Sequence, residues 1–357
     1  MKPLDGNAIV YCEGAYNTPN GKTAHGLVRF TRRYKVLSVV DERYTGSDAG
    51  FILDGRGNGI PIVDSVDTAL ENARRSNMIA THFVVGLAPD GGRLHDRNRE
   101  DILRAITRGL NIDSGLHDFL TDDPIIMDHA RTYGITIRDI RKPPDRKYLH
   151  FFSGEIESVQ STRVAVLGTD SAVGKRTTAW KIVTGLQERG LNATMIGTGQ
   201  TAWLQGAEYG IILDSLVNDF VSGEIEHAIV RAWNERRPQA MILEGQGSLL
   251  NPAYPGGFEL LAAGRPHCIV LQHAPGRVEY DGFPGYPIHP LRNQIAAVEL
   301  IAEKPVVAIT MNHEGIEIDD LESIRKRIHR ETKLPVVDPL VHVMDEVIDA
   351  ISPFMGT

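Results

Sequence analysis

A lysine and several hydroxyl side chains that follow a short apolar run form the pattern in this chain that most clearly indicates chemistry. The run Val164–Leu167 ends at Gly168, and five residues separate that glycine from the pair Gly174-Lys175. Apolar residues at helical spacing come next and end at Gly190. A strand, a glycine-bounded loop and a helix form a phosphate-binding loop, or P-loop, in which backbone N–H groups and the lysine face an anion. The sequence therefore predicts a phosphorylated ligand at this loop.

The loop departs from the usual pattern G-x-x-x-x-G-K-[ST] at the position that normally holds a metal. Arg176 follows Lys175 directly, and Thr177 and Thr178 come one place late. Because the usual hydroxyl binds Mg²⁺, a metal is expected here only if Thr177 takes over that role. The residues predicted to bind the phosphorylated cofactor are Gly168, Thr169, Asp170, Ser171, Val173, Gly174, Lys175, Arg176, Thr177 and Thr178.

Two polar side chains end other apolar strands of the second half. Glu244 follows the run Met241–Leu243 and precedes glycines, and Asn312 follows another apolar run. A side chain at the carboxyl end of a parallel strand points into the crevice where ligands of α/β sheets bind. Glu244 is therefore predicted either to hold Mg²⁺ together with Thr177, if a metal is used, or to act as a base. Asn312 is predicted to read a nucleotide base through its paired donor and acceptor atoms.

The composition excludes several classes of function. With 42% hydrophobic and 24% charged residues, the 357-residue chain has the composition of a globular protein long enough for two domains. Its net charge of −8 argues against nucleic-acid and anionic-membrane binding, and no apolar run reaches the roughly 20 residues that span a bilayer. The N-terminus lacks the apolar core of a secretory signal, and Cys12 and Cys268 form no CxxC pair. We expect a cytoplasmic homo-oligomer without nucleic-acid or membrane partners.

The first 145 residues are predicted to alternate strands and helices, which implies a largely parallel sheet with helices on both faces. Asp41 follows the second expected strand, where Rossmann-type domains place a ribose-binding acid. No G-x-G-x-x-G follows the first strand, so we expect no dinucleotide site here. The expected strands are Ala8–Cys12, Val36–Val40, Phe83–Gly86, Ile125–Met127 and Ile135–Asp139, and the expected helices include Val66–Ser76 and Arg99–Gly109.

Two prolines within Arg141–Lys147 interrupt this pattern and indicate a boundary between domains 1–145 and 146–357. The second domain is predicted to be a further parallel α/β unit with a surface helix over Asp320–Leu334. The loop Tyr280–Pro290, rich in proline, glycine and tyrosine, suits a lid or a subunit contact. Besides the strand before the P-loop, the expected strands are Ala193–Ile196, Ala240–Leu243, Cys268–Gln272, Val306–Thr310 and Val336–Val337.

Two motifs of the second half resemble those of dethiobiotin synthetase and its relatives. Gly168–Lys175 is similar to the extended P-loop G-T-D-T-x-V-G-K-T, and Glu244–Pro252 is similar to E-G-A-G-G-x-x-x-P, whose acid contacts Mg²⁺. The chain departs from them at Arg176, which replaces the metal-binding threonine, and at Ser248, which replaces the last glycine. This resemblance covers the P-loop domain alone. It implies an alternative function, an ATP- and Mg²⁺-dependent ligase or kinase acting on a small carboxylate.

Over nearly its full length the chain is similar to a family long labelled only as a domain of unknown function. That family pairs a Rossmann-like N-terminal domain with a P-loop NTPase-like domain, and both sheets are parallel. Its members include DgcN-type D-glutamate N-acetyltransferases, which act in D-amino-acid catabolism. The resemblance implies transfer of acetyl from acetyl-CoA to the amino group of an acidic amino acid, with D-glutamate expected. The shared stretches are Lys22–Arg29, Gly86–Gly92, Ser114–Leu120, Gly168–Thr178, Gly197–Thr201, Asp219–Glu224 and Glu244–Ser248.

This activity assigns roles to further residues. Coenzyme A carries a pyrophosphate and a 3′-phosphate, so the P-loop can hold it without splitting ATP. The amine needs a base, for which Asp219 and Glu224 in shared stretches and Glu244 in the crevice are the catalytic candidates. His273 and His313, which follow strands, are alternatives. A small-molecule dicarboxylate substrate calls for fixed cations and hydrogen-bond donors, and the candidates in shared N-terminal stretches are Lys22, Thr23, Arg29 and His117.

Overall fold

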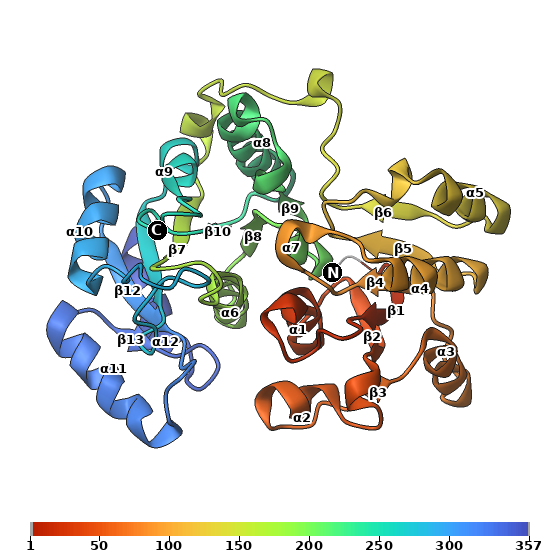
Figure 1. Ribbon diagram of the computed structural model, residues 1–357. Coiled ribbons are helices and arrows are strands. Elements are labelled where there is room, and N and C mark those ends of the chain that lie inside the picture. Colours follow the sequence, from red (N-terminus) through yellow and green to blue (C-terminus); the bar gives the residue numbers. More distant parts are fainter. Residues whose placement is uncertain (1–2, 356–357) are drawn as a thin grey trace. The chain divides into compact units, whose positions relative to one another are not determined.

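The computed structural model describes residues 3–355 and divides the chain into two compact units. One unit comprises the chain up to Pro143 together with Gln200–Gly206, and the other comprises Pro144–Gly199 and the chain from Ala207 onward. Each unit is built on one parallel β-sheet with α-helices packed against it (Figure 1). The predicted fold class, two α/β domains with parallel sheets, is confirmed.

The N-terminal sheet has six strands in the order β3-β2-β1-β4-β5-β6, and all neighbouring strands are parallel. This is the strand order of Rossmann folds, whose chain crosses from one side of β1 to the other between β3 and β4. Ligands of such sheets bind outside the carboxyl ends of the strands at this switch point, between β1 and β4. The strands are β1 (Gly6–Tyr11), β2 (Tyr34–Val40), β3 (Ile62–Val63), β4 (His82–Val85), β5 (Asn111–Ser114) and β6 (Ile137–Asp139).

One predicted strand of this unit is wrong, because Ile125–Met127 lies in the helix α5 (Pro124–Tyr133). The carboxylate of Asp123 accepts hydrogen bonds from the N–H groups of Ile125 and Ile126, at 2.9 and 3.1 Å, and caps this helix. An aspartate followed by proline is a strong helix start, and it outweighs the β-preference of a short apolar run. The sequence patterns also missed β5, because an aspartate at position 113 is typical of a loop. In the structure Asp113 is buried and bound to Tyr34 and Arg138.

The helices of the N-terminal unit connect its strands on the sheet faces. The predicted helices Val66–Ser76 and Arg99–Gly109 correspond to α3 and α4. A short helix from later in the chain, α7 (Gln200–Leu204), packs in this unit, where the hydroxyls of Thr23 and Thr201 lie 2.9 Å apart. The helices of continuous sequence are α1 (Lys22–Arg29), α2 (Ala49–Asp54), α3 (Val66–Arg75), α4 (Asp96–Thr107) and α5 (Pro124–Tyr133).

The C-terminal sheet has seven parallel strands in the order β13-β12-β11-β7-β10-β8-β9. The strand before the P-loop, β7, lies between β10 and β11 and is buried over its whole length (Figure 1). Every strand predicted for this half is present, and only the two-residue β9 was not expected. The strands are β7 (Thr162–Gly168), β8 (Ala193–Gly197), β9 (Tyr209–Gly210), β10 (Ala240–Glu244), β11 (Cys268–His273), β12 (Val306–Met311) and β13 (Val336–Val337).

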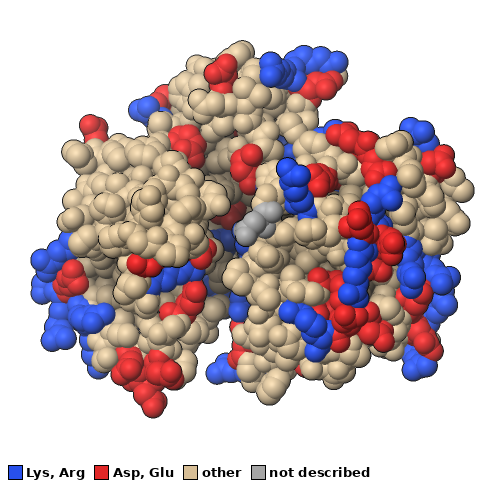
Figure 2. All heavy atoms as spheres, viewed as in Figure 1, with Lys and Arg blue, Asp and Glu red and all other residues tan. Residues whose placement is uncertain are grey.

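The helices of this unit include the predicted surface helix, which is α11 and buries Leu321 and Ile328 on one stripe. Within residues 3–355, no helix is both long and apolar enough to cross a bilayer. Figure 2 shows acidic and basic side chains interspersed over the face in view, which agrees with the modest net charge of −8. The helices are α6 (Lys175–Glu188), α8 (Asn218–Arg236), α9 (Phe258–Gly264), α10 (Leu291–Ala302), α11 (Ile318–Thr332) and α12 (Asp345–Ile351).

Two glutamates of α8 hold the segment that follows the domain boundary. Glu226 is 3% exposed, and its carboxylate accepts hydrogen bonds from the N–H groups of Ser153 and Ile156, at 2.6 and 3.1 Å, and from the Ser153 hydroxyl. Burial alone would raise the pKa of Glu226, but these donors outweigh it and lower that pKa. Glu224 accepts from the N–H and Nδ1 of His150, at 2.7 and 2.8 Å.

We predict that Glu226→Gln lowers the free energy of unfolding by about 1.5–3 kcal/mol, because an amide replaces a charged acceptor of several hydrogen bonds. Urea unfolding at neutral pH measures the loss, and Glu188→Gln, at an exposed position of α6, should stay within about 0.5 kcal/mol of wild-type. Since the folded-state pKa is lowered, this stabilisation is present above the ordinary pKa of a glutamate and is lost as the pH falls below it. Equal stability of both variants at neutral pH would contradict the assignment.

Candidate active site

The P-loop joins β7 to α6 through a turn that needs unusual backbone angles. Ala172 and Gly174 have φ values of 52° and 106°, in the left-handed region that favours glycine. Among the described residues, no side chain caps the N-terminus of α6, which begins at Lys175. The first N–H groups of a helix lack partners within the helix, and together with the helix dipole they attract an anion. The local geometry is therefore that of a phosphate-binding loop.

Lys175 folds back into the loop. Its Nζ donates hydrogen bonds to the carbonyl oxygens of Asp170 and Gly247, at 2.8 and 2.7 Å, and the residue is only 7% exposed. Gly168 makes room for this side chain, because a Cβ at that position would lie 2.9 Å from Nζ. Burial lowers the pKa of Lys175 to about 8, although the nearby charges of Asp170 and Glu244 act to raise it. A bound phosphate would favour the charged form of this amine.

Asp170 ties the P-loop to two other loops of the same sheet edge. One oxygen of its fully buried carboxylate accepts from the Ser171 N–H and the Asn251 amide, at 2.7 and 2.8 Å. The other accepts from the Arg277 guanidinium and the Asp281 N–H, both at 2.9 Å. Asn251 comes from the loop after β10, and Arg277 and Asp281 come from the loop after β11. This carboxylate shapes the loop, and cofactor binding by Asp170 stays a prediction.

The sequence patterns did not single out Asn251 and Arg277, although a weak signal existed for both. Each follows a strand that neighbours β7, so each comes from the sheet edge that carries the P-loop. Arg277 also donates to the carbonyl of Ser171 and pairs with Glu314 at 2.7 Å. An arginine or an asparagine in a long loop has many possible partners, and only the fold selects Asp170 among them.

Two hydroxyls of the loop region are engaged within the protein. Thr169 Oγ1 lies 3.0 Å from Nδ1 of His273, whose pKa is lowered to about 4 by burial. The buried Thr178 donates to Oε1 of Gln272, which also accepts from Thr310 at 2.5 Å. Since its pKa is so low, the His273 ring is neutral near pH 7. These two threonines therefore help to join β7, α6 and β11.

Glu244 lies at the carboxyl end of β10, the strand beside β7, as the sequence predicted. It is 5% exposed, and one of its oxygens accepts a hydrogen bond from the N–H of Thr198 at 2.9 Å. Burial raises the pKa of Glu244, and among the charges that oppose this rise Arg176 acts more strongly than Lys175. Arg176 is half-buried, and its Nε lies inside the protein. The structure thus brings Lys175, Arg176 and Glu244 together in one cluster of charges.

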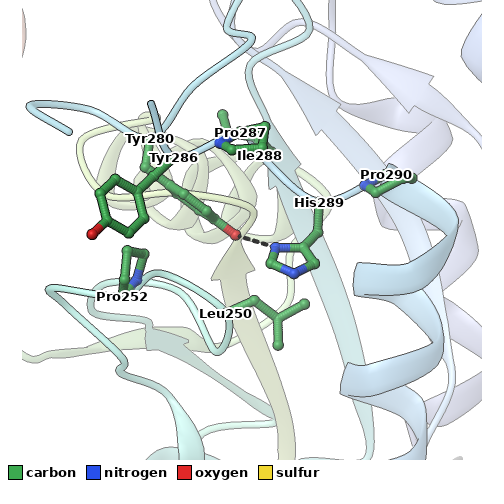
Figure 3. Close-up of a pocket in the computed structure, with 8 residues that line it drawn as sticks. All are labelled: Leu250, Pro252, Tyr280, Tyr286, Pro287, Ile288, His289 and Pro290. Atoms are coloured by element: carbon green, nitrogen blue, oxygen red, sulfur yellow. Dashed lines mark hydrogen bonds between the residues drawn. The ribbon is translucent and has the colours of Figure 1, made fainter. Parts of the chain in front are cut away.

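The same unit contains a pocket of about 380 Å³ (Figure 3). Its polar feature is the contact between the Tyr280 hydroxyl and Nδ1 of His289, which are 2.9 Å apart. Asn251 and Asp281, which both bind Asp170, are sequence neighbours of pocket residues, so the pocket lies next to the P-loop. The loop Tyr280–Pro290 forms most of its wall. The lining residues are Leu250, Pro252, Tyr280, Tyr286, Pro287, Ile288, His289 and Pro290.

The other predicted residues of this unit have different surroundings. Asp219 is exposed in the first turn of α8, and the Glu224 carboxylate is bound to His150. Asn312 is half-buried after β12, and its side-chain oxygen accepts a hydrogen bond from the N–H of Glu314 at 3.0 Å. The structure therefore shows the Glu224 carboxylate holding the segment that follows the domain boundary. The side-chain oxygen of Asn312 stabilises a turn.

An imidazole–carboxylate pair follows the same strand as Asn312. Nδ1 of His313 lies 2.6 Å from the carboxylate of Asp338, which is 1% exposed, whereas the His313 side chain is 30% exposed. A carboxylate that holds one ring nitrogen fixes the tautomer and leaves the other nitrogen able to take a proton. This pair has the geometry of a general base, which the sequence alone could only suggest through the position of His313.

In the N-terminal unit, three of the four predicted substrate residues come from one edge of the sheet. Lys22 and Thr23 begin α1, which follows β1, and His117 follows β5. The carboxyl ends of these parallel strands meet at the edge where Rossmann folds bind ligands. Lys22 and His117 are exposed, whereas Thr23 is buried against Thr201. Lys22 and His117 are thus placed where a ligand could reach them.

Two other charged side chains of this unit, Arg29 and Asp41, are bound to neighbouring residues within the fold. Arg29 lies at the other end of α1, about 10 Å along the helix from Lys22, and its guanidinium is paired with Asp54 at 2.6 Å. The structure therefore does not bring Arg29 together with the other substrate candidates. Asp41 is buried, and its carboxylate accepts hydrogen bonds from the Arg43 guanidinium at 2.7 Å and from the N–H of Tyr16 at 2.8 Å.

Two curated proteins resemble the chain over most of its length. A D-glutamate N-acetyltransferase from Tritonibacter scottomollicae is 28% identical over 292 residues, which cover 80% of this chain and 85% of that protein. A D-glutamate N-acetyltransferase from a Pseudoalteromonas species is 30% identical over 279 residues, which cover 75% of this chain and 80% of that protein. The similarity therefore extends over both units.

A solved structure and two family models agree with this similarity. The crystal structure of a DUF1611 family protein from Anabaena variabilis superimposes with a TM-score of 0.89 at 28% identity and covers 97% of this chain and 99% of that one. Residues 42–143 match the Rossmann-like domain of unknown function DUF1611_N, and residues 150–348 match the P-loop domain of unknown function DUF1611_C. The chain therefore belongs to the DUF1611 family, which combines a Rossmann-like domain with a P-loop domain.

Proposed function

We propose that the protein is an N-acetyltransferase that moves acetyl from acetyl-CoA to the amino group of an acidic amino acid, D-glutamate. The observation that carries this proposal is a P-loop with two adjacent cations, Lys175 and Arg176, beside a pocket with mostly apolar side chains. Coenzyme A has the matching parts, a highly charged phosphate end and an uncharged arm. The names of the two curated relatives support the same reaction.

In this proposal the P-loop holds the phosphates of coenzyme A and breaks no phosphate bond. The N–H groups of the first turn of α6 and the side chains of Lys175 and Arg176 supply the hydrogen-bond donors. A charge-assisted hydrogen bond to phosphate contributes about 1.5–3 kcal/mol. The pyrophosphate and 3′-phosphate together carry more charge than one lysine can balance, which suits a loop with a second cation.

The pocket beside the P-loop would take the pantetheine arm. The arm has methyl and methylene groups, which fit walls of leucine, isoleucine, proline and tyrosine, and amides that can bond to a polar group such as the Tyr280–His289 pair. This arrangement carries the thioester away from the phosphates. Glu244, which is next to Lys175 and Arg176, then belongs to the phosphate end of the ligand.

Acetyl transfer requires a neutral amine, which attacks the thioester carbonyl. The C–N bond forms, the C–S bond breaks, and coenzyme A leaves as a thiolate that takes up a proton. A base must accept the proton that the amine loses. Asp219, Glu224 and Glu244 stay predictions for this role, and of the two histidine alternatives we favour His313, because its Nδ1 is bound to the carboxylate of Asp338.

Recognition of the acceptor is assigned to the N-terminal unit. A dicarboxylate needs cations and hydrogen-bond donors, and Lys22 and His117 are exposed at the carboxyl edge of that sheet. Thr23 lies behind Lys22 in the first turn of α1, where it bonds to Thr201 and fixes the start of the helix. Arg29 is left out of this assignment because Asp54 holds its guanidinium.

We predict that Lys175→Ala weakens binding of acetyl-CoA about 10- to 100-fold, which isothermal titration calorimetry measures. Lys181→Ala, at an exposed position of the same helix, is the matched control and should bind as wild-type does. Because the free amine has a pKa of about 8, the affinity of wild-type should fall as the pH rises through 8, and Lys175→Ala should lose this dependence. Unchanged affinity in Lys175→Ala would place the phosphates elsewhere.

The pocket assignment predicts a different pattern for Leu250→Trp. The larger side chain fills the pocket and should weaken binding of acetyl-CoA about 10-fold or more, whereas 3′-phospho-ADP, which lacks the pantetheine arm, should bind as tightly as to wild-type. Calorimetry with both ligands makes the comparison, and Leu300→Trp, at an exposed site of α10, serves as control. Equal losses for both ligands would mean that the substitution disturbs the P-loop and would remove the pocket from the proposal.

The reaction is tested by following free thiol. Wild-type protein should release coenzyme A from acetyl-CoA when D-glutamate is added, and an absence of release with acidic amino acids would overturn the proposal. Lys22→Ala should raise KM for the amino acid about 10-fold or more with little change in kcat, because it removes a charge-assisted contact to a carboxylate. Arg29→Ala is the control, and its KM should stay close to wild-type because its guanidinium serves Asp54.

A further inference from the structure

P-loops that act on nucleotides use Mg²⁺, which such a loop binds through oxygen atoms. Mg²⁺ prefers oxygen ligands in an octahedral arrangement, normally the hydroxyl after the P-loop lysine, an acid and phosphate oxygens. Here the position after Lys175 carries the guanidinium of Arg176, which can only donate. Among the described residues, no group of three His, Cys, Asp or Glu side chains could hold a metal ion.

Two oxygen-bearing side chains near the loop are engaged within the protein, whereas the Ser248 hydroxyl is buried without a hydrogen-bond partner among residues 3–355. The carboxylate of Asp170 accepts from Ser171, Asn251, Arg277 and Asp281, and the Thr178 hydroxyl donates to Gln272. Thr177, the residue that follows Arg176 in α6, is half-buried. Successive residues of a helix point about 100° apart, so its hydroxyl does not share the direction of the Arg176 side chain. The position that supplies the usual hydroxyl ligand of Mg²⁺ therefore carries no oxygen in this loop.

The acid that would complete a metal site interacts electrostatically with a cation that belongs to the chain. Glu244 is 5% exposed at the end of β10, with one oxygen bound to the N–H of Thr198, and its charge interacts with that of Arg176. A divalent ion at the same place would lie beside a permanent positive charge, and the two would repel. Arg176 therefore occupies the sequence position of the residue whose hydroxyl binds the metal ion in other P-loops.

We propose that Arg176 replaces the divalent cation, so that this P-loop binds its phosphorylated ligand without Mg²⁺. Guanidinium is always charged and presents its donors in a fork that matches two phosphate oxygens. The inference rests on the proposed function only in that the P-loop holds phosphates. A P-loop without Mg²⁺ suits coenzyme A, because the phosphates of coenzyme A only need to be bound. Phosphoryl transfer from ATP, in contrast, depends on a metal that bridges the phosphates.

The test uses calorimetry with coenzyme A as the probe, once with excess Mg²⁺ and once with EDTA. Wild-type should show the same dissociation constant in both, within about two-fold. Arg176→Thr restores the usual Gly-Lys-Thr sequence, so its binding in EDTA should be about 10- to 100-fold weaker, and Mg²⁺ should recover part of the loss. Arg176→Lys keeps a charge but loses the fork, and should be intermediate and insensitive to Mg²⁺.

Several results would overturn this inference. These are a wild-type protein that binds coenzyme A only with Mg²⁺, or an Arg176→Thr variant that binds as tightly as wild-type in EDTA. Melting temperatures of the variants show whether they fold. If Arg176→Thr does not fold, Arg176→Lys still tests the inference. A parallel titration with ATP separates the two proposals. Binding of ATP but not of coenzyme A in EDTA would refute the acetyl-CoA assignment and support the role of Arg176, whereas no binding of coenzyme A together with binding of ATP only with Mg²⁺ would refute both.

Discussion

The carboxylate of Asp170 is the interaction on which the rest of the C-terminal site depends. A fully buried charge destabilises a fold unless it is fully hydrogen-bonded, and four donors satisfy this one. Three of them come from loops that follow the two strands beside β7. The Asp170 carboxylate therefore helps to position both the P-loop and the loops that form the wall of the nearby pocket.

Around this anchor the site balances charges that the chain itself supplies. Lys175 is held by carbonyl oxygens, and the positive charges of Arg176 and Lys175 oppose the rise that burial causes in the pKa of Glu244. A phosphate that enters can take the place of the carbonyls around Lys175. The loop is thus prepared for an anion by interactions made during folding.

The sequence predicted those features that depend on local patterns, and failed where a distant partner decides. Local patterns predicted the apolar strands of the P-loop half, the glycine-bounded loop and the position of Glu244 at the end of a strand. Arg29 looked free to bind a carboxylate because nothing in its neighbourhood points to Asp54. β5 was missed because the buried Asp113 is acceptable in a strand only once Tyr34 and Arg138 are beside it.

The short helix α7 has a consequence for how the protein is made. Its residues follow β8 of the P-loop sheet in sequence, yet Gln200–Gly206 pack with the N-terminal unit, where Thr201 bonds to Thr23 and Gln205 bonds to the carbonyl of Gly26. During synthesis, the N-terminal unit cannot be completed until the ribosome has also made β7, the P-loop, α6 and β8. The chain passes between the units at three points, so neither unit corresponds to a contiguous segment that recombination could exchange intact.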